Sequence, residues 1–116
     1  MGPSVNPTRW TVETSQEVDD WIDRLSGSAQ RKLYREISKI EKFGRQAGYP
    51  AIEKYEDDLY STRVNDDRAF GAFSGGKYLM CTVVLNKKKP RLSKRETRVV
   101  RDRVRACLGT EPKGVE

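Results

Sequence analysis

The sequence predicts an α+β protein: a small antiparallel sheet with a helical hairpin on one face and an open basic face on the other. Two changes of period along the chain support this prediction. Apolar residues between residues 15 and 43, and again after residue 93, follow the three-to-four-residue spacing of amphipathic helices. Between residues 59 and 85 the period is two, as in half-buried strands. The predicted order is strand, helix, helix, three strands, helix.

The first half of the chain predicts a short strand and the hairpin. Residues 8–13 alternate as a strand does, and Thr14 with Glu17 forms a capping box that begins a helix. The helix has an apolar stripe of Val18, Trp21, Ile22 and Leu25. Ser-Gly-Ser at 26–28 breaks it, and a second helix runs to Gly44. Its apolar face consists of Leu33, Ile37, Ile40 and Phe43. Residues 45–58 have no sustained period, so we expect a surface loop there.

The second half predicts a meander and a last helix. Residues 59–64, 68–74 and 77–85 have the length and alternation of strands, and their short connections require antiparallel neighbours. Ser93 and Glu96 form a second capping box, after which Val100 and Val104 supply a narrow apolar stripe, extended by Cys107 or Leu108.

Length and composition favour one domain without a cofactor. We expect a single domain over residues 9–108, with flexible ends at 1–8 and 109–116. Cys81 and Cys107 fit small core positions, and without any histidine they cannot form a standard zinc site. Neither a long apolar span nor a signal-peptide pattern is present, so we expect a cytoplasmic protein that does not contact the membrane.

The positive charge is concentrated in the second half. Residues 1–60 contain nine basic and eleven acidic residues, whereas residues 61–116 contain fourteen basic and six acidic ones. A one-sided field of this kind favours a polyanionic partner, either nucleic acid or an acidic protein segment.

The alternation of residues 59–64 places Arg63 on the face opposite Tyr60. Arg68 begins the next strand and can lie beside Arg63 across the short turn. Two neighbouring guanidiniums would suit a phosphate, which both could bind in bidentate fashion. Pairing of these arginines with Asp66 or Asp67 in the turn is an equally good reading of the sequence. Lys87, Lys88, Lys89 and Arg91 then leave the last strand beside the same sheet.

These segments together resemble the RelE and HigB family of toxins from bacterial and phage toxin–antitoxin systems. The matching stretches are VDDWIDRL, LYSTRV, DRAF, the apolar strand at 77–85 and NKKKPRLSKRE, within residues 9–108. The resemblance implies a RelE-like fold and a ribosome-dependent endoribonuclease that cuts mRNA without a metal. In such a reaction the 2′-hydroxyl of one nucleotide attacks the adjacent phosphate. The resemblance also implies a cognate antitoxin that neutralises the enzyme.

Carried over to this chain, the resemblance assigns Arg68 and Lys88 to stabilisation of the phosphate and the transition state. Arg63 would position the scissile group, and Lys87 or Lys88 would serve in proton transfer. The further RNA-binding candidates are Lys54, Lys89, Arg91, Lys94, Arg95 and Arg98. Because the chain has no histidine, relatives that use histidine as acid or base are not a guide to it.

Two alternatives stay open on the sequence. The ParE-like branch of the same superfamily inhibits DNA gyrase through protein contacts. A degenerate toxin, or a plain nucleic-acid-binding module, would use the basic residues without catalysing a reaction.

Overall fold

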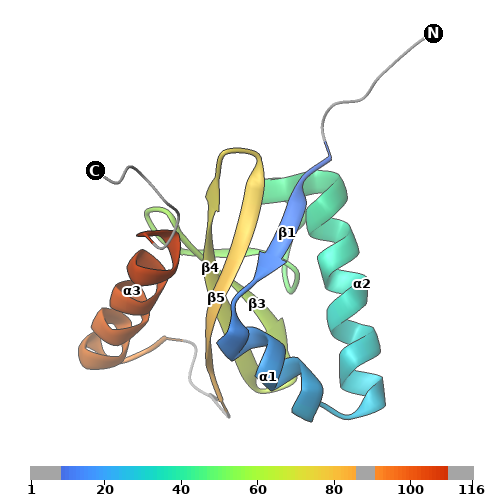
Figure 1. The fold of residues 1–116 in the computed structure, drawn as a ribbon, viewed down its shortest axis with the longest axis horizontal. Coiled ribbons are helices and arrows are strands. Elements are labelled where there is room, and N and C mark those ends of the chain that lie inside the picture. Colours follow the sequence, from blue (N-terminus) through green and yellow to red (C-terminus); the bar gives the residue numbers. More distant parts are fainter. Residues whose placement is uncertain (1–8, 86–90, 110–116) are drawn as a thin grey trace, which may run out of the picture.

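The computed structural model describes residues 9–85 and 91–109. Its elements are β1 (Thr11–Thr14), α1 (Gln16–Arg24), α2 (Gly27–Phe43), the 3-10 helix η1 (Gly44–Gln46), β2 (Glu53–Glu56), β3 (Leu59–Val64), β4 (Asp67–Ser74), β5 (Lys77–Val84) and α3 (Lys94–Gly109) (Figure 1). The predicted α+β class is confirmed. None of the helices in the described ranges is long and apolar enough to cross a membrane.

The five strands form one sheet in the order β1-β5-β4-β3-β2. Strands β2 to β5 are an antiparallel meander, as predicted for β3 to β5, and β1 joins β5 in parallel. Strand β2 was not predicted, because residues 45–58 were expected to form a loop. Glu53 and Lys54 pair with Ser61 and Tyr60, but the register then shifts before Glu56, so this short edge strand has no alternating pattern.

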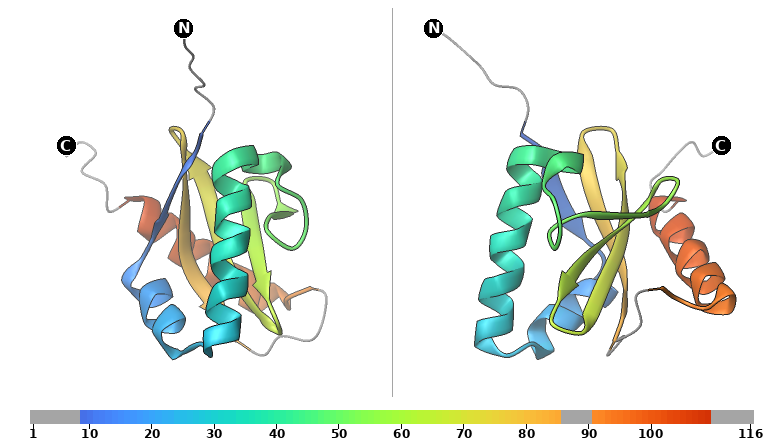
Figure 2. Two further views of the ribbon diagram at one scale, coloured as in Figure 1. Left: turned by 90° about the vertical axis from the view of Figure 1, so that its right-hand side faces the viewer. Right: turned by 180° about the vertical axis from the view of Figure 1, so that it is seen from behind.

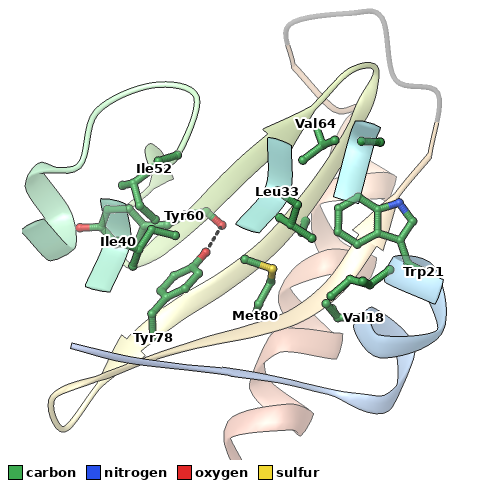
Figure 3. Close-up of a cluster of buried hydrophobic side chains, with 13 residues drawn as sticks. Val18, Trp21, Leu33, Ile40, Ile52, Tyr60, Val64, Tyr78 and Met80 are labelled. Carbon is green, nitrogen blue, oxygen red and sulfur yellow. Dashed lines mark hydrogen bonds between the residues drawn. The ribbon is translucent and has the colours of Figure 1, made fainter. Parts of the chain in front are cut away.

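The hairpin of α1 and α2 covers one face of the sheet, as predicted (Figure 2). The main core contains Val18, Trp21, Leu33, Ile40, Tyr60, Val64, Tyr78 and Met80 (Figure 3). Within it, the Tyr78 hydroxyl donates a 3.3 Å hydrogen bond to the carbonyl of Tyr60. Phe43 departs from the prediction, since 58% of its surface is exposed. The helix ends directly after it, and Gly44 instead packs closely against the Trp10 ring.

Helix α3 lies across the opposite face of the sheet (Figures 1 and 2). A second apolar cluster joins them and contains Leu59, Phe70, Ala72, Leu79, Cys81, Leu92, Val100 and Val104. The predicted stripe of α3 is therefore confirmed, and Cys81 lies in the core as expected. The basic face is consequently open only where α3 does not cover it.

The capping residues agree with the prediction at α3 and differ at α1. At α3, the Ser93 Oγ accepts from the Glu96 N–H at 3.1 Å, and Glu96 accepts from the Ser93 N–H at 2.8 Å. At α1 the cap is Ser15, not Thr14: its Oγ accepts from the Val18 N–H at 3.2 Å. Glu17 does not close a box there, because its carboxylate reaches the Thr82 hydroxyl at 2.8 Å.

Candidate phosphate-binding site

Arg63 and Arg68 are direct cross-strand partners on β3 and β4. The turn of Asn65 and Asp66 joins the two strands. Alternation places both arginines on the face that α3 partly covers, since Phe70, two residues after Arg68, belongs to the cluster under α3. The predicted proximity of the two arginines is therefore confirmed. Arg68 exposes only 2% of its surface, whereas Arg63 is partly exposed.

The surroundings of Arg68 disfavour its positive charge. Burial lowers the pKa of Arg68 below its ordinary value, and the neighbouring charge of Arg63 lowers it further. Glu53, Tyr55 and Tyr49 act in the opposite direction, but more weakly. An arginine stays charged even so. Two cations are thus held side by side, one of them largely out of water, and an anion bound between them would be strongly favoured.

The backbone around Arg63 is held by its neighbours. Its N–H donates to the carbonyl of Pro50 at 3.0 Å. Its Nε donates to the carbonyl of Asn65 at 3.2 Å. The Asn65 side chain in turn accepts a 3.1 Å hydrogen bond from Lys32 of α2. The segment before β2, the β3–β4 turn and α2 therefore meet at the exposed end of the arginine pair.

Tyr55 of β2 connects this site to the chain that leads into α3. Its ring meets Phe70 edge to face at 5.6 Å, and the guanidinium of Arg91 lies 4.6 Å from its centre. Its hydroxyl accepts from the Leu92 N–H at 2.9 Å. Because Phe70 lies two residues after Arg68 on β4, Arg91 lies on the same face of the sheet as the arginine pair. Arg91 is additionally 3.4 Å from Glu56.

The other predicted site residues fall into three groups. Lys87, Lys88 and Lys89 lie outside the described residues, which end at Leu85 and resume at Arg91. Exposed positions in the first turns of α3 are occupied by Lys94, Arg95 and Arg98. Lys54 is placed differently: it is paired with Tyr60, so strand alternation directs it to the face covered by α1 and α2.

The later arginines of α3 include two that hold the helix in place. Arg101 lies 2.7 Å from Glu56 and 3.8 Å from Asp57, and the hydrogen bond to Glu56 raises the pKa of Arg101. Arg103 approaches Glu17 of α1 at 3.7 Å. Throughout residues 9–85 and 91–109, no group of three or more histidine, cysteine or acidic side chains is arranged to hold a metal ion.

Sequence reasoning named Lys54 from residues 49–55 but missed the contribution of Tyr49 and Glu53 to the site. Tyr49, Glu53 and Tyr55 all affect the pKa of Arg68, although they come from a stretch predicted to be a surface loop. The two tyrosines of this segment are the signal of this role in the sequence. Their approach to Arg68 depends on the pairing of β2 with β3, which no local pattern indicates.

Comparisons with known proteins identify a family and a fold. The sequence model of the family described as "Phage derived protein Gp49-like (DUF891)" matches residues 20–105. Among solved structures, the chain is similar to one in the archaeal RelE–RelB complex from Pyrococcus horikoshii OT3. The TM-score is 0.59 at 15% sequence identity, over 70% of this chain and 99% of that one. No curated protein matches the sequence significantly. The predicted resemblance to RelE-type proteins is thereby confirmed.

Proposed function

Because the chain belongs to the family of phage-derived Gp49-like proteins and has the RelE fold, we propose that it is the toxin of a type II toxin–antitoxin system. We further propose that it cuts mRNA on the ribosome. The observation that supports this activity best is the cross-strand pair of Arg63 and buried Arg68. Two neighbouring guanidiniums can bind the oxygens of one phosphate together.

In the proposed reaction the 2′-hydroxyl of one nucleotide attacks the adjacent phosphorus, and the bond from phosphorus to the 5′-oxygen of the next nucleotide breaks. The products are a 2′,3′-cyclic phosphate and a free 5′-hydroxyl. Negative charge on the phosphoryl oxygens rises in the transition state, so fixed guanidiniums accelerate the step. Arg68, held rigidly by burial, stabilises that charge, and Arg63, nearer to solvent, positions the scissile group.

The lysines between Leu85 and Arg91 complete the proposed site. Lys88 adds positive charge at the phosphate, and Lys87 or Lys88 transfers protons. A lysine crowded among other cations loses its proton more readily than an isolated one, which suits it to this role. The nucleophile belongs to the RNA itself, so the reaction needs no metal to generate it.

The proposed partners follow from the charge on the same side of the molecule. Exposed Lys94, Arg95 and Arg98 of α3 suit contacts with ribosomal RNA. An acidic antitoxin that covers them would block the ribosome through the same attraction. The proposed place of action is the cytoplasm, where ribosomes and mRNA are found.

Expression in a bacterial host tests the proposed function. The wild type, Arg68→Ala and Arg105→Ala would each be induced, and the 5′ ends of mRNA on ribosomes would be mapped. Arg105 is a suitable control because it is an exposed arginine of α3 beside Asp102, at 3.7 Å. We expect growth arrest with codon-phased cleavage in the wild type and in Arg105→Ala, and neither effect in Arg68→Ala.

Other outcomes would replace the proposal. Growth arrest with DNA damage and intact mRNA would identify a gyrase inhibitor. Absence of arrest in the wild type would indicate a nucleic-acid-binding module or a degenerate toxin. Cleavage that persists in Arg68→Ala would remove the arginine pair from the mechanism.

A further inference from the structure

An open hollow adjoins the arginine pair on the side of α2. It has a volume of about 300 Å³ and lies between α2, the Tyr49–Pro50 segment and the start of the β3–β4 turn. Figure 2 shows the segment after α2 curling beside that helix and β3. Arg63 lines the hollow as well, so the phosphate-binding site and the hollow share one side chain. The volume is at the lower end of the ~300–1,000 Å³ range of ligand pockets.

Three cations from two elements line this hollow. Lys32 and Arg35 are three residues apart on α2 and therefore share one face of the helix, and Arg63 comes from β3. Both α2 cations are exposed. Their charges extend the positive charge of Arg63 toward α2. Several neighbouring cations favour a phosphate backbone over an uncharged ligand.

Tyr49 supplies an exposed aromatic ring at the same hollow. It exposes 63% of its surface, although its neighbours Ala51 and Ile52 are buried. An exposed tyrosine next to cations is the usual platform on which an unpaired base of single-stranded nucleic acid stacks. Base stacking would give the Tyr49 ring a role at the surface, outside the core.

Among the described residues, Glu36 is the one acidic side chain that lines the hollow. It exposes 4% of its surface, and its Oε1 pairs with the Lys39 ammonium at 3.4 Å without a well-aligned hydrogen bond from the described residues. A buried carboxylate oxygen without a well-aligned donor can accept a hydrogen bond from an N–H group of a ligand. Among bases, adenine, cytosine and guanine carry an amino group, and uracil does not.

We infer that this hollow binds the nucleotide next to the scissile phosphate of single-stranded RNA. Tyr49 stacks on its base, Glu36 accepts a hydrogen bond from an amino group of the base, and Lys32 and Arg35 bind the neighbouring phosphate. The inference rests on the proposed function, because it requires that Arg63 and Arg68 bind RNA. It adds a preference for bases with an exocyclic amino group, because uracil could offer Glu36 only its ring N3–H.

Binding of short fluorescent RNA strands tests this inference. Strands with 2′-fluoro ribose cannot supply the attacking hydroxyl, so fluorescence anisotropy measures affinity alone. One strand would contain only uridine, and three others would each carry one adenosine, cytidine or guanosine in a uridine background. We expect the wild type to bind at least one amino-bearing strand several-fold more tightly than the uridine strand.

The variants separate the three contributions. Tyr49→Ala should weaken binding about fivefold to a hundredfold, the range for loss of one base–aromatic stack, whereas Tyr34→Ala on exposed α2 surface should not. Lys32→Ala and Arg35→Ala should weaken all strands alike and lower the salt slope by about one each, with Arg31→Ala unchanged. Glu36→Met, which has no strong acceptor for an amino group, should remove the base preference and change the affinity for all strands alike.

Two results would overturn the inference. Equal binding of all strands by the wild type would exclude recognition through Glu36. Unchanged affinity of the Tyr49, Lys32 and Arg35 variants, together with weakened binding by Arg68→Ala, would exclude the hollow and leave the proposed function intact. If Arg68→Ala also bound as the wild type does, the phosphate-binding site itself would be wrong.

Discussion

At Arg68, the requirements of folding and of phosphate binding oppose each other. The guanidinium is buried to 2% exposure and lies across from Arg63, and both conditions lower the pKa of Arg68. Removing a charged group from water costs free energy, and a neighbouring like charge adds to that cost. A phosphate bound by both guanidiniums would offset part of that cost.

The first prediction follows from this conflict. Arg68→Met replaces the buried cation with an apolar side chain of similar length. We expect the free energy of unfolding to rise by about 1 kcal/mol, because the cost of burying the charge and the repulsion from Arg63 outweigh the contacts that the guanidinium makes. Urea denaturation without phosphate measures the change. Inorganic phosphate should then stabilise the wild type and not the variant.

The control for this prediction is Arg63→Met. Because the Arg63 side chain is partly exposed, this substitution should raise the free energy of unfolding by less than Arg68→Met does. A loss of stability in Arg68→Met of about 2 kcal/mol or more would show that the guanidinium holds the fold together. In that case its burial would not be evidence of a phosphate site.

At the scale of elements, the regular parts of the chain were predictable and the irregular parts were not. Strand β3 and the stripes of α1 and α3 follow one period throughout, so their faces could be assigned from spacing alone. Strand β2 could not, because its register shifts after Lys54 and its pairing with β3 is a tertiary contact. The cap of α1 was displaced by one residue, since Thr14 and Ser15 have similar capping ability.

The second prediction distinguishes these two candidate caps. Ser15→Ala should cost about 1–2 kcal/mol, because the Ser15 hydroxyl caps α1 and also donates to the Cys81 carbonyl at 2.8 Å. Thr14→Ala should cost less than about 0.5 kcal/mol, since the hydrogen bond from Thr14 to Asp19 is exposed. Thermal or urea unfolding of both variants measures the difference. Equal losses would contradict the assignment of Ser15 as the cap.

At the scale of the whole molecule, the site lies where three segments distant in sequence come together. The β3–β4 turn brings Arg63 to Arg68, the segment around β2 brings the tyrosines, and the chain entering α3 brings Arg91. The arginine pair was predictable, because alternation and a short turn determine it locally. Glu36 and Tyr49 were not, because only the packing of α2 beside the turn brings them to one hollow.

The two faces of the sheet are covered to different extents, and this difference explains how one small domain combines a core with a basic surface. Helices α1 and α2 cover the whole of one face, and α3 covers part of the other. Salt bridges from Arg101 and Arg103 hold α3 to β2 and α1, so some of the basic residues serve the fold. The remaining cations are left for an anionic partner.

The measurement that tests the central claim most directly is cleavage of an mRNA on purified ribosomes. The message would carry a single 2′-deoxynucleotide at the cleavage position or none. We predict cuts that end in a 2′,3′-cyclic phosphate, that vanish with the 2′-deoxynucleotide, and that fall by a factor of about 100 or more in Arg68→Ala. Arg105→Ala should cut as the wild type does. Cleavage of the 2′-deoxy message, or undiminished cleavage by Arg68→Ala, would contradict the account.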